Sequence, residues 1–351
     1  MLTPRILFPR VWYRNRHPLG YVLAPLSWPF CLAVAVRRFA YGRRFITARH
    51  PGIPVIVVGN ITTGGTGKTP LVIRLAKFLR DHFRPAIVVR GYGGKARRWP
   101  QWVKADSDPH LMGDEAVLLA RRASCPVFAA PDRVAAAMAS MECADCNLIL
   151  CDDGLQHYAL ERDLEIAVVD GILGYGNGRC LPAGPLREPV SRLATVDFVV
   201  KNTLARNLPD CGECDGGEYS MRLIPGEPRS VLNECAESLD AFRESPVHAV
   251  CGIGHPERFF ETLRRLGLAI RPHVFSDHHA FGSDELAFGD DLPIFMTEKD
   301  AVKCRRFAEP HHWYLPVEAE LRPEFLLHLL DALFRAESEN RVTSGKVRQT
   351  S

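Results

Sequence analysis

The first fifty residues contain no lysine, no aspartate and no glutamate, although the chain of 351 residues has 44 basic and 41 acidic side chains. All the basic side chains of this segment are arginines: Arg5, Arg10, Arg14, Arg16, Arg37, Arg38, Arg43, Arg44 and Arg49. They give the segment a formal charge of +9, and because the whole chain carries +3, the remainder carries −6. This separation of charge predicts that the N-terminal segment contacts an anionic surface, either a nucleic acid or a membrane.

Charge of either sign is missing from Leu19–Val36, an apolar run flanked by arginines. Its length permits a membrane span, but Pro18 precedes it, Pro25 and Pro29 interrupt it, and positive charge on both flanks favours no orientation. Amphipathic aromatic residues typical of the headgroup boundary are Trp12, Tyr13, Tyr21 and Trp28. We therefore predict that residues 1–50 form a membrane-interfacial segment, with core packing and a true span as alternatives. No small-residue cleavage site follows, so a cleaved signal peptide is not predicted.

Cysteine is too sparse for a disulfide scaffold, with 11 residues in this length. Two pairs have the spacing of zinc ligands, Cys143 with Cys146 and Cys211 with Cys214, but the gap between the pairs is far longer than in a zinc ribbon. Reduced cytosolic thiols are the simpler interpretation, and a structural zinc is the alternative. Internal repeats and coiled-coil heptads are also missing.

A phosphate-binding loop is the clearest feature that the sequence does contain. In Val55–Pro70 an apolar β-branched run leads into a glycine-rich loop ending in Gly67-Lys68-Thr69. Glycines let backbone N–H groups surround phosphates, the lysine reaches the β and γ oxygens, and the threonine hydroxyl contacts Mg²⁺. The strict pattern has glycine where this chain has Thr62. The residues predicted to bind ATP are Thr62, Thr63, Gly64, Gly65, Thr66, Gly67, Lys68 and Thr69.

Short apolar runs alternate with helical patterns after this loop. The expected strands are 55–58, 86–89, 127–129, 148–151, 166–169 and 198–200. Buried strands alternating with helices predict a doubly wound, mostly parallel sheet of the P-loop NTPase kind, which binds ligands at the carboxyl ends of its strands. We expect this kinase-like domain over 51–202, a smaller α/β domain over 203–336 that returns to the first domain near its end, and a polar tail over 337–351.

Polar clusters follow several expected strands. Asp152 and Asp153 end an apolar run, as a Walker B element does, and are predicted to lie near Mg²⁺. Arg90 and Tyr92, in a glycine-rich turn, suit a sugar or phosphate. The proline-clamped loop 181–189 presents Arg187, suited to a phosphate, and Glu188, suited to a metal or hydroxyl. Asp114 and Glu115 open a helix, where capping is the simpler role of Asp114. In 277–279 a histidine paired with a carboxylate across a domain cleft is favoured over zinc.

The motifs GGTGKTP, RGYGG, GDE, DDGLQH, LPAGPLREP, DHHAF and TEKDAVK occur in this order and together resemble the tetraacyldisaccharide 4′-kinases of lipid A biosynthesis. The resemblance covers about residues 10–330. It implies transfer of a phosphoryl group from ATP, with Mg²⁺, to the 4′-hydroxyl of a tetraacylated glucosamine disaccharide 1-phosphate. It also implies a location at the cytoplasmic face of the inner membrane of a Gram-negative bacterium, peripheral or monotopic.

By the same resemblance, Lys68 and Asp153 are catalytic, Asp114 is the base for the acceptor hydroxyl, and His278 positions it or raises its basicity. Thr69, Asp153 and three further carboxylates belong to the metal and phosphate network: Glu115, Asp152 and Glu188. The expected partners are the acylated lipid and an anionic inner membrane, with no nucleic acid and no obligate protein partner. A membrane-associated deviant P-loop ATPase switch is the alternative function, although such proteins carry lysine where this chain has Thr63.

Overall fold

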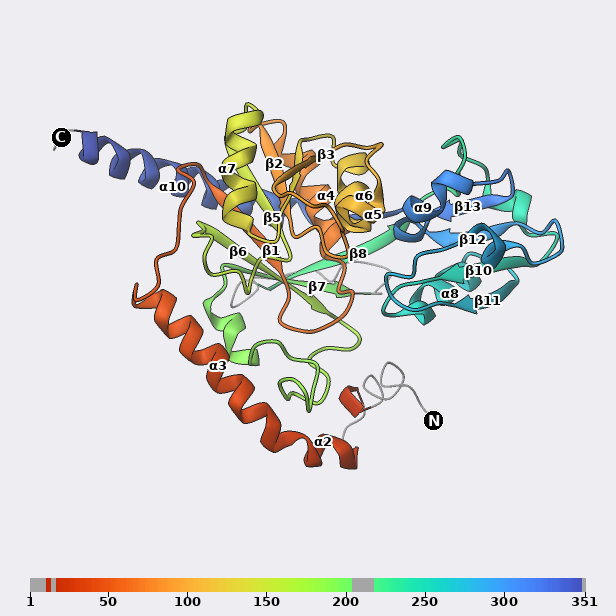
Figure 1. The fold of residues 1–351 in the computed structure, drawn as a ribbon, viewed down its shortest axis with the longest axis horizontal. Helices are drawn as coiled ribbons and strands as arrows, with labels where there is room; N and C mark the ends of the chain where they lie inside the picture. The colour runs from red at the N-terminus through yellow and green to blue at the C-terminus, as the bar shows by residue number, and fades with distance from the viewer. Residues whose placement is uncertain (1–10, 14–16, 204–217, 349–351) are drawn as a thin grey trace.

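The structure, a computed structural model, describes residues 11–13, 17–203 and 218–348. Two α/β domains lie side by side, and an N-terminal helical segment runs along the outside of the larger one (Figure 1). The α/β architecture with a large, mostly parallel sheet confirms the predicted fold class. Cys211 and Cys214, the first four arginines and the end of the polar tail lie outside the described residues.

The larger domain is built on a sheet of nine strands in the order β14-β8-β7-β6-β1-β5-β2-β4-β3. The strands are β1 Val55–Gly59, β2 Pro85–Val89, β3 Gln101–Val103, β4 Val127–Ala129, β5 Leu148–Asp152, β6 Leu164–Asp170, β7 Phe198–Thr203, β8 Glu218–Pro225 and β14 Val317–Leu321. Only the edge strands β3 and β14 are antiparallel to their neighbours. All six strands expected from the apolar runs are present. Because β1 is central and buried on both faces, its side chains are continuously apolar.

Helices cover both faces of this sheet. The helices are α4 Lys68–Leu79, α5 Pro109–Met112, α6 Asp114–Arg122, α7 Arg133–Cys143 and α10 Pro323–Arg348. Alternate residues of a strand point to opposite faces. Ile56 and Val58 accordingly pack in one core with α4, α6 and α10, whereas Val55 and Val57 pack in another with α7.

The smaller domain has five strands in the order β11-β10-β12-β13-β9. They are β9 Arg229–Ser230, β10 Val247–Cys251, β11 Ile270–Val274, β12 Ile294–Thr297 and β13 His312–Leu315, with α8 Pro256–Arg265 and α9 Glu298–Cys304. Short 3₁₀ helices are η1 Val190–Thr195, η2 Leu239–Phe242, η3 Ser283–Leu286 and η4 Arg305–Phe307.

The strand β8 belongs to the large sheet, so the smaller domain begins later than the expected boundary at 203. The chain leaves the large sheet after β8 and returns through β14 and α10. The two connections touch, since the Gly226 N–H donates to the Pro316 carbonyl oxygen at 2.9 Å. The domains are joined covalently by these two adjacent connections, which place few restraints on the angle between the domains.

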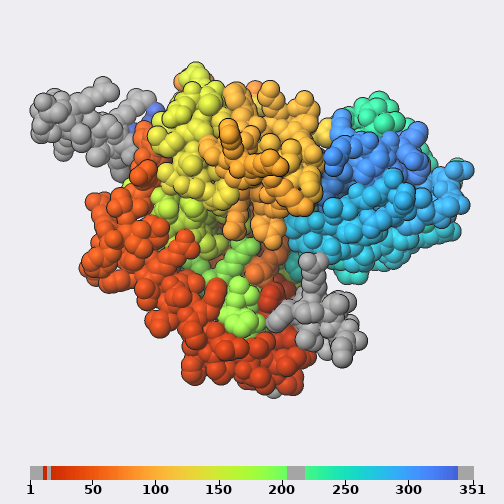
Figure 2. Space-filling model, in the orientation of Figure 1, coloured from red at the N-terminus to blue at the C-terminus, as the bar shows by residue number. Residues whose placement is uncertain are grey.

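The N-terminal segment forms α2 Pro18–Val22 and α3 Ala24–Gly42, and α3 continues through Pro29. These two helices lie along the flank of the larger domain, away from the smaller one (Figure 2). Most of its large apolar side chains face solvent: Tyr21, Val22, Leu26, Trp28, Leu32, Val36 and Phe39. Trp28 is 74% exposed, so ordinary core packing, one of the expected alternatives, does not account for this surface. Among the described residues, no helix has the length and apolar character needed to cross a membrane.

Candidate active site

The phosphate loop connects β1 to α4, with α4 beginning at Lys68. Gly64 and Gly67 have φ of +110° and +96°, a backbone conformation that glycine adopts without strain. A Cβ on Gly67 would lie 2.9 Å from Asn202 Nδ2, so the position has no room for a side chain either. The hydroxyls of Thr63 and Thr66 are buried and have no hydrogen-bond partner among the described residues. The loop therefore has the turns, the small residues and the unused donors that suit an anionic ligand at a helix N-terminus.

Lys68 lies between the loop and the end of β5. Its Nζ is 3.1 Å from Asn60 Oδ1 and 3.4 Å from Asp153 Oδ1. The next residue, Thr69, donates its hydroxyl to Asp152 Oδ2 at 3.4 Å. The predicted pairing of the phosphate loop with the Asp152-Asp153 element is thus seen in the geometry.

The two neighbouring aspartates have opposite electrostatics. Burial and the charge of Glu115 raise the pKa of Asp152 to about 7. For Asp153, burial acts in the same direction, but the charges of Lys68 and Arg187 outweigh it and hold its pKa well below the usual range. Asp153 also has φ of +51°, a strained conformation for a residue with a side chain, as often found at functional sites. The element therefore keeps one fixed anion beside one carboxyl that titrates near neutral pH.

The loop 181–189 pairs directly with the phosphate loop. The N–H of Arg187 donates to Ile61 O at 2.7 Å, and the N–H of Thr63 donates to Pro185 O at 2.8 Å. The Arg187 guanidinium lies 3.1 Å from Asp153 Oδ2. Arg187 is therefore presented at the phosphate loop, as expected.

Glu188 has a different environment from the one expected of a metal ligand. It is completely buried, and its two oxygens accept hydrogen bonds from Tyr158 Oη and Gln156 Nε2. Gln156 also donates to Asn60 O at 3.1 Å. Because both oxygens already have donors, Glu188 holds these loops together instead of offering a free ligand.

A second cluster combines both domains. Asp114 begins α6 in the larger domain, and His278 lies between β11 and η3 in the smaller one. His278 Nδ1 is 3.0 Å from Asp114 Oδ2, and His278 has φ of +58°. Burial raises the pKa of Asp114, but the hydrogen bond from His278 and the charge of Lys299 outweigh burial and lower it. The same hydrogen bond raises the pKa of His278, against burial and Lys299.

Lys299, at the start of α9, was not predicted from the sequence, although it lies within the TEKDAVK motif. Its Nζ is 2.9 Å from Glu115 Oε1. Glu115, expected in the metal network, is therefore paired with a cation from the other domain. Its charge nevertheless raises the pKa of Asp152, so the two clusters are within electrostatic reach of each other.

Arg90 and Tyr92 flank the second cluster. The Tyr92 ring centroid lies 4.9 Å from that of His278, and the Arg90 guanidinium lies 5.9 Å from the Tyr92 ring. Tyr92 is 55% exposed, which leaves it accessible to a ligand.

A further contact between the domains was missed because its residues match no motif. Arg258 of α8 pairs with Asp170 at the end of β6. His255 lies beside the phosphate loop, since a Cβ on Gly64 would be 2.8 Å from its Nε2. Only the tertiary structure brings these residues to the site.

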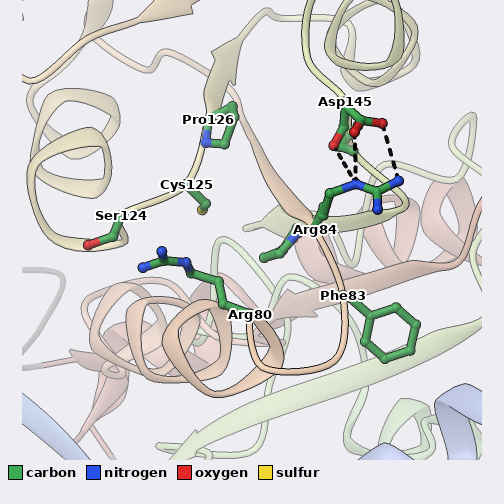
Figure 3. Close-up of a pocket in the computed structure, with 9 residues that line it drawn as sticks. Arg80, Phe83, Arg84, Ser124, Cys125, Pro126 and Asp145 are labelled. Atoms are coloured by element: carbon green, nitrogen blue, oxygen red, sulfur yellow. Dashed lines mark hydrogen bonds and ion pairs between the residues drawn. The ribbon is translucent and has the colours of Figure 1, made fainter.

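A cavity of about 290 Å³ lies elsewhere, where β2 and β4 begin (Figure 3). Its lining includes Arg80, Arg84, Cys125, Asp145 and Cys146, and none of its lining residues is a predicted site residue. Burial raises the pKa of Cys125 to about 12, which keeps it a thiol. Among the residues that the structure describes, no group of three or more His, Cys, Asp or Glu is placed so that it could hold a metal.

Comparisons with known proteins show what the chain as a whole is similar to. A family model described as tetraacyldisaccharide-1-P 4′-kinase matches residues 19–335. A tetraacyldisaccharide 4′-kinase from Nitrosococcus oceani is 52% identical over 339 residues, which are 96% of this chain and 97% of that protein. The same-named protein from Alkalilimnicola ehrlichii is 48% identical over 333 residues, 94% of this chain and 98% of that protein. A crystal structure of LpxK from Aquifex aeolicus in complex with ATP aligns with a TM-score of 0.75 and 27% identity, covering 91% of this chain and 99% of that chain.

Proposed function

We propose roles for the site residues from one premise: the chain belongs to the tetraacyldisaccharide-1-P 4′-kinase family and is an ATP-dependent kinase of lipid A biosynthesis. The reaction transfers a phosphoryl group to the 4′-hydroxyl of a tetraacylated disaccharide 1-phosphate. This assignment confirms the predicted enzyme class. The family is that of the kinase and not that of the alternative function, a membrane-associated switch ATPase.

The observation that carries the proposed mechanism is the 3.0 Å contact between Asp114 and His278. Asp114 is ionised at neutral pH and accepts the proton of the 4′-hydroxyl as a general base. Although burial raises the pKa of Asp114, the hydrogen bond from His278 lowers it, so His278 does not raise the basicity of Asp114. His278 orients the carboxylate by donating from Nδ1. Since the two residues come from different domains, the arrangement of the domains assembles this part of the site.

The phosphate loop and Lys68 bind the ATP phosphates in this proposal. Phosphoryl transfer requires positioning and charge neutralisation more than covalent chemistry. The Lys68 ammonium, held by Asn60 and Asp153, supplies positive charge at the transferred group. Arg187 also pairs with Asp153 and supplies a second positive charge.

Three oxygen-bearing residues fit Mg²⁺: Thr69, Asp152 and Asp153. The Oδ1 atom of Asp152 is buried without a hydrogen-bond partner among the described residues, and Mg²⁺ prefers such oxygen ligands. When bound, the ion neutralises charge on the β and γ phosphates. Glu188 is not included, because it is completely buried against Tyr158 and Gln156. Glu115 is not included, because its Oε1 pairs with Lys299 of the other domain instead of with the phosphate loop.

The acceptor lipid is proposed to reach the site from a membrane. Tyr92 and Arg90 lie beside the Asp114–His278 pair, where they suit the disaccharide and its phosphate. The exposed apolar side of α3, with arginines at its C-terminal end, suits the headgroup region of an anionic bilayer. We place this surface on the cytoplasmic face of the inner membrane, where ATP is present, in a Gram-negative bacterium.

A kinase assay with labelled ATP and detergent-dispersed tetraacyldisaccharide 1-phosphate tests these roles. We expect Lys68→Ala to reduce kcat more than His278→Ala, because a positioned acid–base group contributes about 10²–10⁴-fold whereas Lys68 acts on the transferred charge itself. His279→Ala is the matched control, since His279 pairs with Glu285 instead of the site. Equal losses for Lys68→Ala and His278→Ala, with folding intact by circular dichroism, would contradict the ranking.

A further inference from the structure

Lys299 is largely buried within the Asp114–His278 cluster, with 17% of its side chain exposed. Besides Glu115, its Nζ lies 3.4 Å from His278 Nε2. Asp114 Oδ2 and Asp277 Oδ1 are each 3.9 Å away from it. One cation from the smaller domain thus contacts three acidic groups and the imidazole.

The backbone around Lys299 is held on both sides. Glu298 accepts from Arg122 of α6 at 2.6 Å. Asp300 accepts from the Gly252 N–H at 3.0 Å and from the Thr297 hydroxyl at 2.7 Å. The residue before Lys299 is therefore tied to the larger domain and the residue after it to the smaller one. These contacts hold the Lys299 ammonium at the junction between the two domains.

This position determines which ring nitrogen of His278 carries the proton. A neutral imidazole has one donor nitrogen and one acceptor nitrogen, and a lysine ammonium can only donate. With Lys299 donating to Nε2, that nitrogen must be the acceptor, so Nδ1 carries the hydrogen and donates to Asp114. The competing neighbour of Nε2 is Asp277 Oδ1 at 3.8 Å, which would favour a proton on Nε2.

We propose that Lys299 is a positioning residue of the kinase reaction, which holds His278 as the neutral Nδ1–H tautomer and so orients Asp114. A doubly protonated His278 would form an ion pair with Asp114 and weaken that carboxylate as a base. This inference rests on the proposed role of the Asp114–His278 pair. The groups facing His278 are Asp114 from α6, Asp277 and Lys299 from the smaller domain, and the Tyr92 ring.

The direct test is ¹⁵N NMR of the histidine rings in the full-length, detergent-solubilised protein at about pH 8, with the His278 signals assigned by their loss in His278→Gln. We expect the wild-type Nε2 signal in the range of an unprotonated nitrogen and Nδ1 in the range of a protonated one. In Lys299→Met, Nε2 should move into the protonated range because only Asp277 remains beside it. A wild-type Nε2 that already carries the proton would overturn the proposal, as would a Lys299→Met spectrum with unchanged His278 nitrogens.

Kinase kinetics provide the second readout. We expect Lys299→Met to lower kcat at least about tenfold, a part of the roughly 10²–10⁴-fold contribution of the acid–base group that it positions, while KM for ATP stays within about threefold. Lys299→Arg, which also donates, should recover part of kcat. Lys77→Met is the matched control, because Lys77 pairs with Glu318 on the surface. A rise in KM for ATP equal to the loss of kcat, or no recovery in Lys299→Arg, would overturn the positioning role.

These results separate the two hypotheses. If His278→Ala keeps the wild-type kcat, the proposed role of the Asp114–His278 pair fails, whatever the NMR spectra show. If His278→Ala loses activity but the Lys299→Met spectrum is unchanged, only the role of Lys299 fails. If Lys299→Met does not fold, the wild-type tautomer of His278 and the kcat of Lys299→Arg still decide whether the positioning role of Lys299 is accepted or rejected.

Discussion

Asp152→Asn is expected to stabilise the metal-free protein while it reduces kinase activity. Asp152 is 5% exposed at the end of β5, and one of its oxygens has no hydrogen-bond partner among the described residues. Burial and the charge of Glu115 raise its pKa to about 7, whereas an aspartate in an unfolded chain has a pKa of about 3.9. Between these values the folded protein holds a proton that the unfolded chain has released.

The size and sign of the effect follow from this difference. Where the folded state binds more protons, its free energy of unfolding decreases as the pH rises, by about 1.4 kcal/mol per pH unit for one group. The contribution is fully favourable below about pH 4 and is lost as the pH rises to about 7, for a total of about 4 kcal/mol. Asparagine cannot ionise, so the free energy of unfolding of Asp152→Asn does not decrease in this way as the pH rises. The difference in stability between variant and wild type should therefore grow by about 2 kcal/mol from pH 5 to 7 and level off above about pH 8.

Urea unfolding at several pH values between 5 and 8 measures this difference, with EDTA present and without nucleotide. Taking the difference between two proteins cancels the contributions of the other titrating groups. Asp145→Asn is the control, because Asp145 is an exposed residue paired with Arg84. A stability difference for Asp152→Asn that is constant between pH 5 and 7 would refute the reasoning, since it would mean that the folded carboxyl does not titrate in this window.

Three further predictions concern the segments that surround the site. Ser27→Ala should lower kcat but leave vesicle binding unchanged, because the buried Ser27 hydroxyl donates to Cys180 O at 2.8 Å and accepts from the Ala183 N–H at 3.2 Å, on the side of α3 facing the 181–189 loop. Leu32→Asp, on the exposed side of α3, should weaken binding to anionic vesicles in a flotation assay but leave kcat in the detergent assay unchanged. A variant of either residue that loses both kcat and vesicle binding would contradict these separate roles. Arg122→Ala should destabilise the protein by about 3 kcal/mol in urea unfolding, because it leaves the buried Glu298 carboxylate unpaired. Adding Glu298→Ala should restore part of that loss, and an equal or larger loss in the double variant would show that the ion pair is not the cause.

Local sequence patterns were sufficient for six of the nine strands of the large sheet. Val55–Gly59 and Leu148–Asp152 are continuous apolar runs because strands buried on both faces have no polar side. The phosphate loop could also be predicted from the sequence. Gly64 and Gly67 have positive φ, which favours glycine, and this preference depends only on a few neighbouring residues. The contact of Thr69 with Asp152 could be expected because carboxyl ends of parallel strands meet at one edge.

The start of the smaller domain was placed too early for a local reason. Residues 203–240 are rich in proline, glycine and charge, so their periodicity is weak. Strand β8 nevertheless joins the large sheet because β7 and β14 supply its partners on either side. Pairing with distant strands decided its place, which no local pattern within 218–225 expresses.

The resemblance to a kinase family identified Asp114 and His278, but their chemistry depends on what lies around them. Lys299 reaches Glu115 across 184 positions of the chain, and Glu188 is occupied by Tyr158 and Gln156. The sequence by itself determined six strands of the large sheet, the phosphate loop and the apolar run, because backbone conformation and hydrophobic patterns are set by neighbouring residues. Only the tertiary structure decided which carboxylates remain free for metal and which are neutralised by a cation from the other domain. The reason is that charges interact through distances in space and not through spacing in the chain.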